Sequence, residues 1–247
     1  MAAATLRLLH DSRLRWLFAG ALLASFAGGL VHGALAARLG GMDAIELQTA
    51  AVSRGAATPL AVVLLVLIAV AGRYRDGSWL HEALAEPRPT RRLLVSAAPV
   101  LAACGAIALS CGAAAAAGSG AAGRIEPGLA LVAVGLHLVV SGIWALWMLG
   151  VAHATRSTML TLAIGAGLPV VVEPAIAGLL AQGDLGALRW LLPGQALRAI
   201  AELPATGGVL LQPVPPAVLP AALGTIVACT AAIGMAAWLR ERGPQPR

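Results

Sequence analysis

The chain has 247 residues, of which 59% are hydrophobic and only 11% are charged, and its mean hydropathy is +0.85. A soluble domain carries about 25% charged residues, so a fully water-facing surface is excluded and most of the surface must face lipid. The 17 basic residues against 11 acidic ones would suit nucleic acid in a soluble protein, but loop arginines set membrane topology, so we expect no nucleic-acid partner.

Cysteine usage and short motifs exclude several kinds of site. The three cysteines lie within apolar runs, and an odd number argues against a disulfide framework. No Cys/His group has the spacing of a metal site. The chain has no lysine and no G-x-x-x-x-G-K-[ST] motif, so it lacks a phosphate loop for ATP hydrolysis. We therefore expect a protein that is not an enzyme and binds no cofactor by itself.

Six apolar runs predict six transmembrane helices in one all-α membrane domain that covers residues 1–247. Residues 1–12 lack the core of a signal peptide, so the first run is expected to remain as a membrane anchor. Runs of this length far exceed a barrel strand of about 10 residues, which leaves helices as the spanning element. The predicted spans cover about residues 16–37, 55–72, 93–117, 127–151, 157–181 and 216–239.

The arginines predict the orientation of these spans. With the N-terminus inside, the cytoplasmic segments hold twelve arginines and the external ones hold five, which agrees with the positive-inside rule. Both termini and the segment 73–92 are therefore predicted to be cytoplasmic.

That segment belongs to the charged stretch "GRYRDGSWLHEALAEPRPTRRLL" between the second and third runs. Gly77 or Ser78 can open a short helix, and Pro87 ends it. Its apolar side comprises Trp79, Leu80, Ala83 and Leu84. One interpretation is a helix that lies in the lipid headgroups. The other is a docking element for a cytoplasmic partner, which the presence of both signs of charge favours.

Glu173 is the most informative polar residue in the fifth run. It lies about 25 Å along the predicted span, in its outer third, where a carboxylate is costly and usually faces a cavity or a partner. Pro174 is expected to kink the helix. Either Glu173 lies near an outer gate and pairs with an arginine such as Arg189, or the helix ends early and Glu173 lies among the headgroups.

The segment 182–215 is expected to be external. Residues 195–203 predict an amphipathic helix with Trp190 as an interface anchor; an ordinary surface loop is the alternative. In the fourth run, His137 is expected to be a packing residue, whereas Ser141 and Trp144 either line a substrate path or pack between helices.

Two long stretches resemble ABC-2-type ABC transporter permeases, in particular actinobacterial members. The first is "GRYRDGSWLHEALAEPRPTRRLLVSAAPVLA", in which Tyr74, Arg75, Gly77, Ser78, "ALAEP" and Arg91 with Arg92 match the segment after the second helix of the family. The second, "STMLTLAIGAGLPVVVEPAIAGLLAQGDLGALRWLLPGQALRAI", is similar to the fifth helix and the external segment that follows it. Arg73 departs from the pattern, because the family often has an acid there.

The resemblance implies the membrane subunit of an ATP-driven exporter in a bacterial cell membrane. Such a permease pairs with a second copy or a paralogue and with two ATP-binding subunits, which bind ATP and magnesium. The apolar spans favour a hydrophobic or amphipathic cargo, such as an antibiotic or a lipid-like compound. A stand-alone secondary transporter or an intramembrane enzyme is the alternative.

The resemblance also implies that the segment 182–215 forms a partly re-entrant external cap. It implies the first of two sets of site residues, and the polar residues discussed above supply the second. The residues expected to couple to the ATPase are Tyr74, Arg75, Asp76, Gly77, Trp79, Leu80, Glu82, Leu84 and Arg88. Those expected at the outer gate or along the pathway are Glu173, Pro174, Arg189, Trp190, His137, Ser141 and Trp144.

Overall fold

The computed structural model describes residues 12–38, 57–86, 88–120, 127–182, 185–201 and 216–242, and every secondary-structure element in these ranges is helical. This confirms the all-α prediction, as expected for a chain whose backbone must satisfy its own hydrogen bonds in lipid. The α-helices are α2 (Ser12–Arg38), α4 (Ala57–Val66), α5 (Gly72–Asp76), α6 (Ser78–Ala85), α7 (Pro89–Gly120), α8 (Pro127–Thr155), α9 (Thr158–Leu162), α10 (Glu173–Gln182), α11 (Pro193–Ala201) and α12 (Leu219–Arg242). Two π-helices, η1 (Leu67–Ala71) and η2 (Ala163–Val172), and two 3₁₀ turns, η3 (Gly186–Leu191) and η5 (Pro216–Val218), complete the set.

Four helical stretches are long and apolar enough to cross a membrane: Pro89–Gly118, Ala130–Thr155, Thr158–Gln182 and Leu219–Arg242. They correspond to the third to sixth predicted runs. The first two runs coincide with α2, which contains the shorter apolar stretch Arg15–Gly28, and with the consecutive helices α4, η1 and α5. The chain is therefore an all-α membrane protein.

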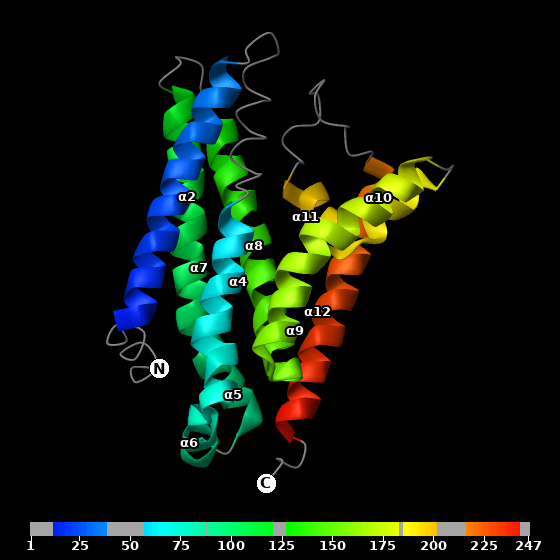
Figure 1. Ribbon diagram of the computed structural model, residues 1–247. Helices are drawn as coiled ribbons and strands as arrows, with labels where there is room; N and C mark the ends of the chain where they lie inside the picture. Colours follow the sequence, from blue (N-terminus) through cyan, green and yellow to red (C-terminus); the bar gives the residue numbers. More distant parts are fainter. Residues whose placement is uncertain are drawn as a thin grey trace.

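Close approach of small residues holds the long helices together. α2 packs along α7 (Figure 1), and a Cβ atom added to Gly118 of α7 would lie 2.5 Å from the carbonyl oxygen of Leu30 in α2. In lipid, helices associate through such contacts rather than through a hydrophobic driving force.

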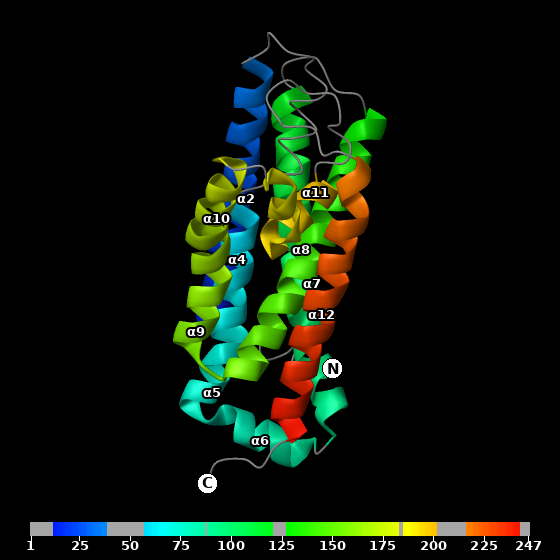
Figure 2. The ribbon, with the colours of Figure 1, turned by 90° about the vertical axis from the view of Figure 1, so that its right-hand side faces the viewer.

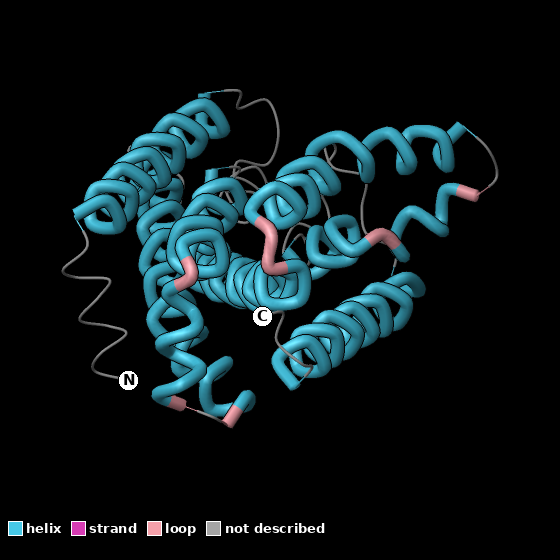
Figure 3. The backbone as a smooth tube through the Cα atoms, turned by 60° about the horizontal axis from the view of Figure 1, so that its bottom comes forward, coloured by secondary structure: helices cyan, strands magenta, loops and turns pink. Residues whose placement is uncertain are grey.

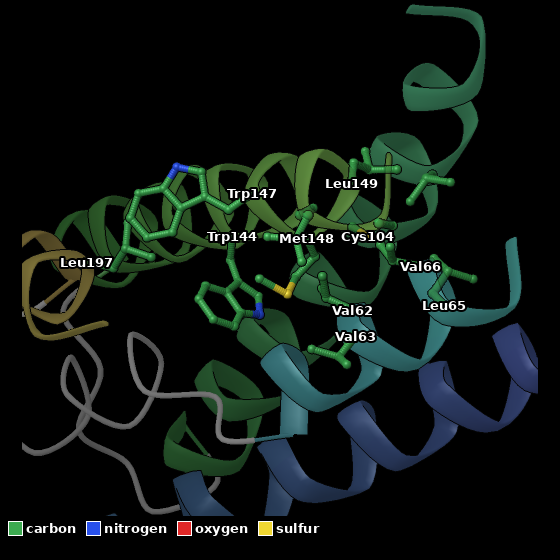
Figure 4. Close-up of a cluster of buried hydrophobic side chains, with 14 of the residues drawn as sticks. Val62, Val63, Leu65, Val66, Cys104, Trp144, Trp147, Met148, Leu149 and Leu197 are labelled. Carbon is green, nitrogen blue, oxygen red and sulfur yellow. The ribbon is translucent and has the colours of Figure 1, made fainter. Parts of the chain in front are cut away.

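The main core lies between α4, α7 and α8, as Figure 4 shows. Val62 and Val66 of α4 meet Cys104 of α7 and the side chains of Trp144 and Met148 of α8, all of them buried. The core extends to α11 and α12, which contribute buried alanines, Leu197 and Ile226. These contacts place α11 against the bundle rather than in a free loop.

The fifth predicted span is continuous but bent. α9 leads through η2 into α10, and α10 leans away from α8 in Figure 1. η2 contains Pro169, which lacks a backbone N–H, and a π-helical stretch with proline is a common site for such a bend. The helix continues beyond Glu173 to Gln182, so the alternative in which it ends at Glu173 is wrong.

One end of the bundle gathers the start of α2, the end of α12 and the short helices α5 and α6. Figures 1 and 2 place all four at the lower end, and Figure 3 looks toward that end. α10 and α11 lie well above it in Figure 1. The first described helix therefore starts, and the last one ends, at the end of the bundle that carries the segment 73–92.

Candidate functional site

The coupling segment, defined here as residues 72–85, is a helix–turn–helix in which Gly77 makes the turn. Its φ of +76° lies in the left-handed region, which glycine adopts because it has no Cβ. Asp76 Oδ1 then accepts a hydrogen bond of 3.0 Å from the backbone N–H of Ser78, so Asp76 helps to start α6. This bond holds the pKa of the Asp76 carboxyl below its usual range.

The two sides of α6 face different surroundings. Trp79 is half-buried, with its ring centroid 5.8 Å from that of Tyr74 and the Arg156 guanidinium carbon 5.0 Å from its centroid. By contrast, Leu80 and Leu84 are 47% and 75% exposed. The predicted apolar side is therefore divided: Trp79 is held by the bundle, and the leucines project outward.

Residues with polar side chains flank the exposed leucines in the sequence. Arg75, Asp76, His81 and Arg88 are all exposed, and Arg91 forms an ion pair with Glu86 at 3.0 Å. The backbone of Glu82 lies in α6, but its side chain is outside the described part of the structure. The outward surface of α6 thus combines an apolar centre with charges of both signs.

The inward side of the coupling segment ends at a buried carboxylate, Glu241 of α12. We define the Glu241 cluster as Tyr74, Arg92, His153, Arg156 and Glu241. The Glu241 side chain is 2% exposed, its Oε2 lies 2.7 Å from Arg92 Nη2, and its Oε1 accepts a hydrogen bond of 2.8 Å from the Tyr74 hydroxyl. A carboxylate with these two partners is well satisfied despite its burial.

His153 extends this cluster into α7. Its Nδ1 lies 2.6 Å from the Tyr74 hydroxyl oxygen and 3.5 Å from Glu241 Oε1, and its Nε2 lies 3.1 Å from Ser96 Oγ. With its proton on Nδ1, His153 donates to the Tyr74 hydroxyl oxygen, and Tyr74 donates to Glu241, while the Ser96 hydroxyl donates to the Leu93 carbonyl oxygen at 2.9 Å. Tyr74 is thus the link between the coupling segment and two long helices.

The two arginines also hold the end of α12 through its backbone. Arg156 Nη2 donates to the carbonyl of Arg240 at 2.9 Å and lies 3.6 Å from Glu241 Oε1, and Arg92 Nη2 lies 3.5 Å from the Glu241 carbonyl oxygen. Cations at a helix C-terminus interact favourably with its dipole. The cluster therefore joins α5, α7, α8, the link after α8, and α12.

The cluster acts on the protonation of Tyr74. Burial, and then the neighbouring carboxylate of Glu241, raise the pKa of the Tyr74 hydroxyl well above its usual range. The phenol therefore stays protonated and remains a donor to Glu241 at neutral pH.

A second buried carboxylate, Glu173, caps the N-terminus of α11. Glu173 is 2% exposed, and its Oε1 accepts a hydrogen bond of 2.9 Å from the Gly194 backbone N–H. A Cβ atom at Gly194 would overlap the carboxylate, so this contact favours glycine. The positive charge of Arg198 on the same helix also acts on Glu173.

The remaining residues predicted near the outer gate lie in the same half of the bundle. Pro174 is exposed in the first turn of α10. Trp190 is buried in η3, with the Arg189 guanidinium carbon 4.6 Å from its ring centroid. The structure thus brings Glu173 to α11, whereas Arg189 stacks on Trp190.

The polar and aromatic residues of α8 point into the bundle. His137, Ser141 and Trp144 are buried, and Trp144 lies edge-on to Trp147 at 6.2 Å (Figure 4). Trp147 Nε1 donates to Thr230 Oγ1 of α12 at 2.8 Å. These side chains face neighbouring helices, and their lining of a transport pathway remains a prediction.

No protein-family model matches this chain, and no curated protein matches it in sequence. Among the described residues, no group of three or more His, Cys, Asp or Glu side chains could hold a metal ion. The functional assignment therefore depends on the geometry of the chain's own residues.

Sequence reasoning missed most of the Glu241 cluster. Only Tyr74 was among the expected site residues, because Glu241 stands in "WLRERG" and looks like an ordinary charge after the last span. The available signals were weak: a single acid between two arginines, and a histidine, His153, near the end of an apolar run.

Proposed function

We propose that the chain is the membrane-spanning subunit of an ABC exporter of the ABC-2 type, in the cell membrane of a bacterium. It crosses the membrane six times, with both termini and the coupling segment in the cytoplasm. ATP and magnesium bind to two separate ATP-binding subunits, since a chain without lysine cannot supply a P-loop. Its cargo is a hydrophobic or amphipathic compound, such as an antibiotic or a lipid-like molecule.

The observation that carries this proposal is the two-sided environment of α6. Its outward surface presents Leu80 and Leu84, with charges of both signs nearby. On its inward side, Trp79 contacts Tyr74 of α5, and Tyr74 is hydrogen-bonded to α12. A helix that transmits motion from an ATPase to a membrane domain needs both features. Its exposed surface must contact the ATPase, and its other side must be fixed to the membrane helices.

The distribution of arginines supports the orientation. The end of the bundle that carries α6 also carries Arg15 at the start of α2, Arg156 after α8, and Arg240 and Arg242 at the end of α12. Positive charge concentrates on the cytoplasmic side of membrane proteins, so α6 would meet a cytoplasmic subunit.

The residues at the other end support a closed outer side. Glu173 fixes the N-terminus of α11, and Ala196, Leu197 and Ala199 of α11 are buried against α8 and α12. We propose that α11 caps the outer side of the pathway and that the permease works with a second copy or a paralogue.

A paired substitution on α6 tests the coupling role. In a complex with the proposed ATP-binding subunits, Leu84→Asp should leave the protein in the membrane and ATP hydrolysis measurable, but abolish most cargo export. His81→Asp places the same charge elsewhere on α6 and should retain export. Export by Leu84→Asp at the wild-type rate would contradict the proposal.

A further inference from the structure

The Glu241 cluster connects elements that are far apart in the sequence. Tyr74 and Glu241 are 167 positions apart, and Arg92 and Glu241 are 149 apart. The hydrogen bond from the Tyr74 hydroxyl to the Glu241 carboxylate directly links the coupling segment to the last helix.

The link is strong because it is buried. Arg92 and Arg156 each expose about a tenth of their side chains, 11% and 10%, and the Nε atoms of both are buried with no partner in the part of the chain that the structure describes. Removing the carboxylate of the cluster would therefore leave two guanidinium groups buried without this counter-charge, which is strongly unfavourable.

α12 also connects the Glu241 cluster to α11, toward the opposite end of the bundle. α12 packs against α11, whose buried face includes Ala196, Leu197 and Ala199, and α11 is held at its N-terminus by Glu173. A displacement of α12 therefore changes the support of α11 and the contact between Gly194 and Glu173.

We propose that Glu241 is the positioning residue through which the coupling segment moves α12, and through α12 the α11 cap. This inference rests on the proposed function for the origin of the push, but the mechanical link itself does not depend on it. In the described structure the cluster is closed. A push on α6 opens it by separating Glu241 from Tyr74, Arg92 and Arg156, and α12 is then able to shift against α8.

Hydrogen exchange tests the link without any partner subunit. In the full chain in lipid nanodiscs, Glu241→Gln should accelerate amide exchange in residues 72–85 severalfold, because the anchor of α5 is lost. Glu86→Gln is the matched control: it removes the exposed ion pair with Arg91 at the same end, and exchange in residues 72–85 should stay close to wild type. Equal exchange in wild type and Glu241→Gln would overturn the proposal.

Transport per ATP hydrolysed separates positioning from simple stability. In the complex with the ATPase, Glu241→Gln should lower the amount of cargo exported per ATP. A loss of folded protein with an unchanged ratio of export to hydrolysis would mean that Glu241 only stabilises the fold, and would overturn the proposal. If wild-type protein stimulates no ATPase, the proposed function fails, and the exchange experiment still decides whether Glu241 anchors the segment.

Discussion

Two buried carboxylates, one toward each end of the bundle, show how this chain uses its few charges. Glu241 binds two arginines and a tyrosine, whereas Glu173 binds the backbone of α11. Burying a carboxylate is tolerated only when such partners replace water. Each therefore fixes one set of helices to another, and substitutions at their partners should have large and specific effects.

Gly194 is the simplest partner to test. Gly194→Ala should lower the free energy of unfolding by about 1–3 kcal/mol, because the added methyl overlaps the Glu173 carboxylate. Gly178→Ala in α10 is the control: nothing lies within 4 Å of its added methyl, so a gain of up to ~1 kcal/mol in helix propensity is expected. Thermal unfolding in detergent measures both, and equal effects would contradict the Glu173 cap.

Tyr74 provides a pH test, because it is the only tyrosine in the chain. Its pKa is raised in the folded protein, so the native tyrosinate absorbance should appear only well above pH ~10, the usual value that the unfolded chain should show. The stabilisation from Tyr74 is present below about pH 10 and is lost above it, since the unfolded state releases its proton first. Glu241→Gln should bring the native titration closer to the usual value.

A native titration near pH 10 would show that the Tyr74 hydroxyl is accessible to solvent and not bound to Glu241. Absorbance titration in nanodiscs, compared with the same protein in denaturant, distinguishes the two results directly.

These residues also mark the limit of what the sequence could predict. Glu173 stands alone among apolar neighbours, so its cost in lipid is visible in the sequence, but its partner Gly194 is not. Glu241 stands among arginines that resemble ordinary flanking charges. Its burial arises only when α5, α7, α8 and α12 meet, and such long-range packing leaves no local pattern.

At the scale of elements, local patterns were a good guide. α6 begins at Ser78, one of the two predicted starts, because the turn and its cap are encoded within three residues, Asp76 to Ser78. α11 begins at Pro193, two residues before the predicted start, and proline is favoured in the first turn of a helix; its predicted end at 203 lies outside the described residues. The π-helices η1 and η2 were not predicted, since a π turn depends on how neighbouring helices pack.

The turn at Gly77 sets the direction of α6. Gly77→Ala should cost roughly 1–2 kcal/mol, because a Cβ is unfavourable in the left-handed region, and amide exchange in residues 78–85 should rise by about tenfold. Gly77→Asn should have a smaller effect, since asparagine visits this region more readily. Equal exchange in both variants would show that backbone strain at Gly77 does not control α6.

At the scale of the whole molecule, the predicted plan has six spans, and four of them correspond to helices long and apolar enough to cross a membrane. Two statements stay predictions: that the first two apolar runs cross the membrane, and that both termini lie on its cytoplasmic side. The crossings are predicted from the length of the apolar runs, and the sidedness is predicted from the arginine distribution.

Sidedness is measured by labelling single cysteines. With Cys104, Cys111 and Cys229 replaced by alanine, Ser78→Cys should react with an impermeant thiol reagent only from the cytoplasmic side. Leu185→Cys, in the exposed turn after α10, should react only from outside. Labelling of both positions from the same side would contradict the six-span plan.

The most direct measurement of the central claim, that α6 docks on a separate ATPase, is site-specific photo-cross-linking in cells. A photoreactive amino acid at position Leu84, whose side chain is 75% exposed on α6, should capture a subunit that carries the ATP-binding motifs. The same group at Leu179, 69% exposed on α10, should capture none. Capture of that subunit from Leu179 alone, or from neither position when both proteins are present in the membrane, would contradict the account.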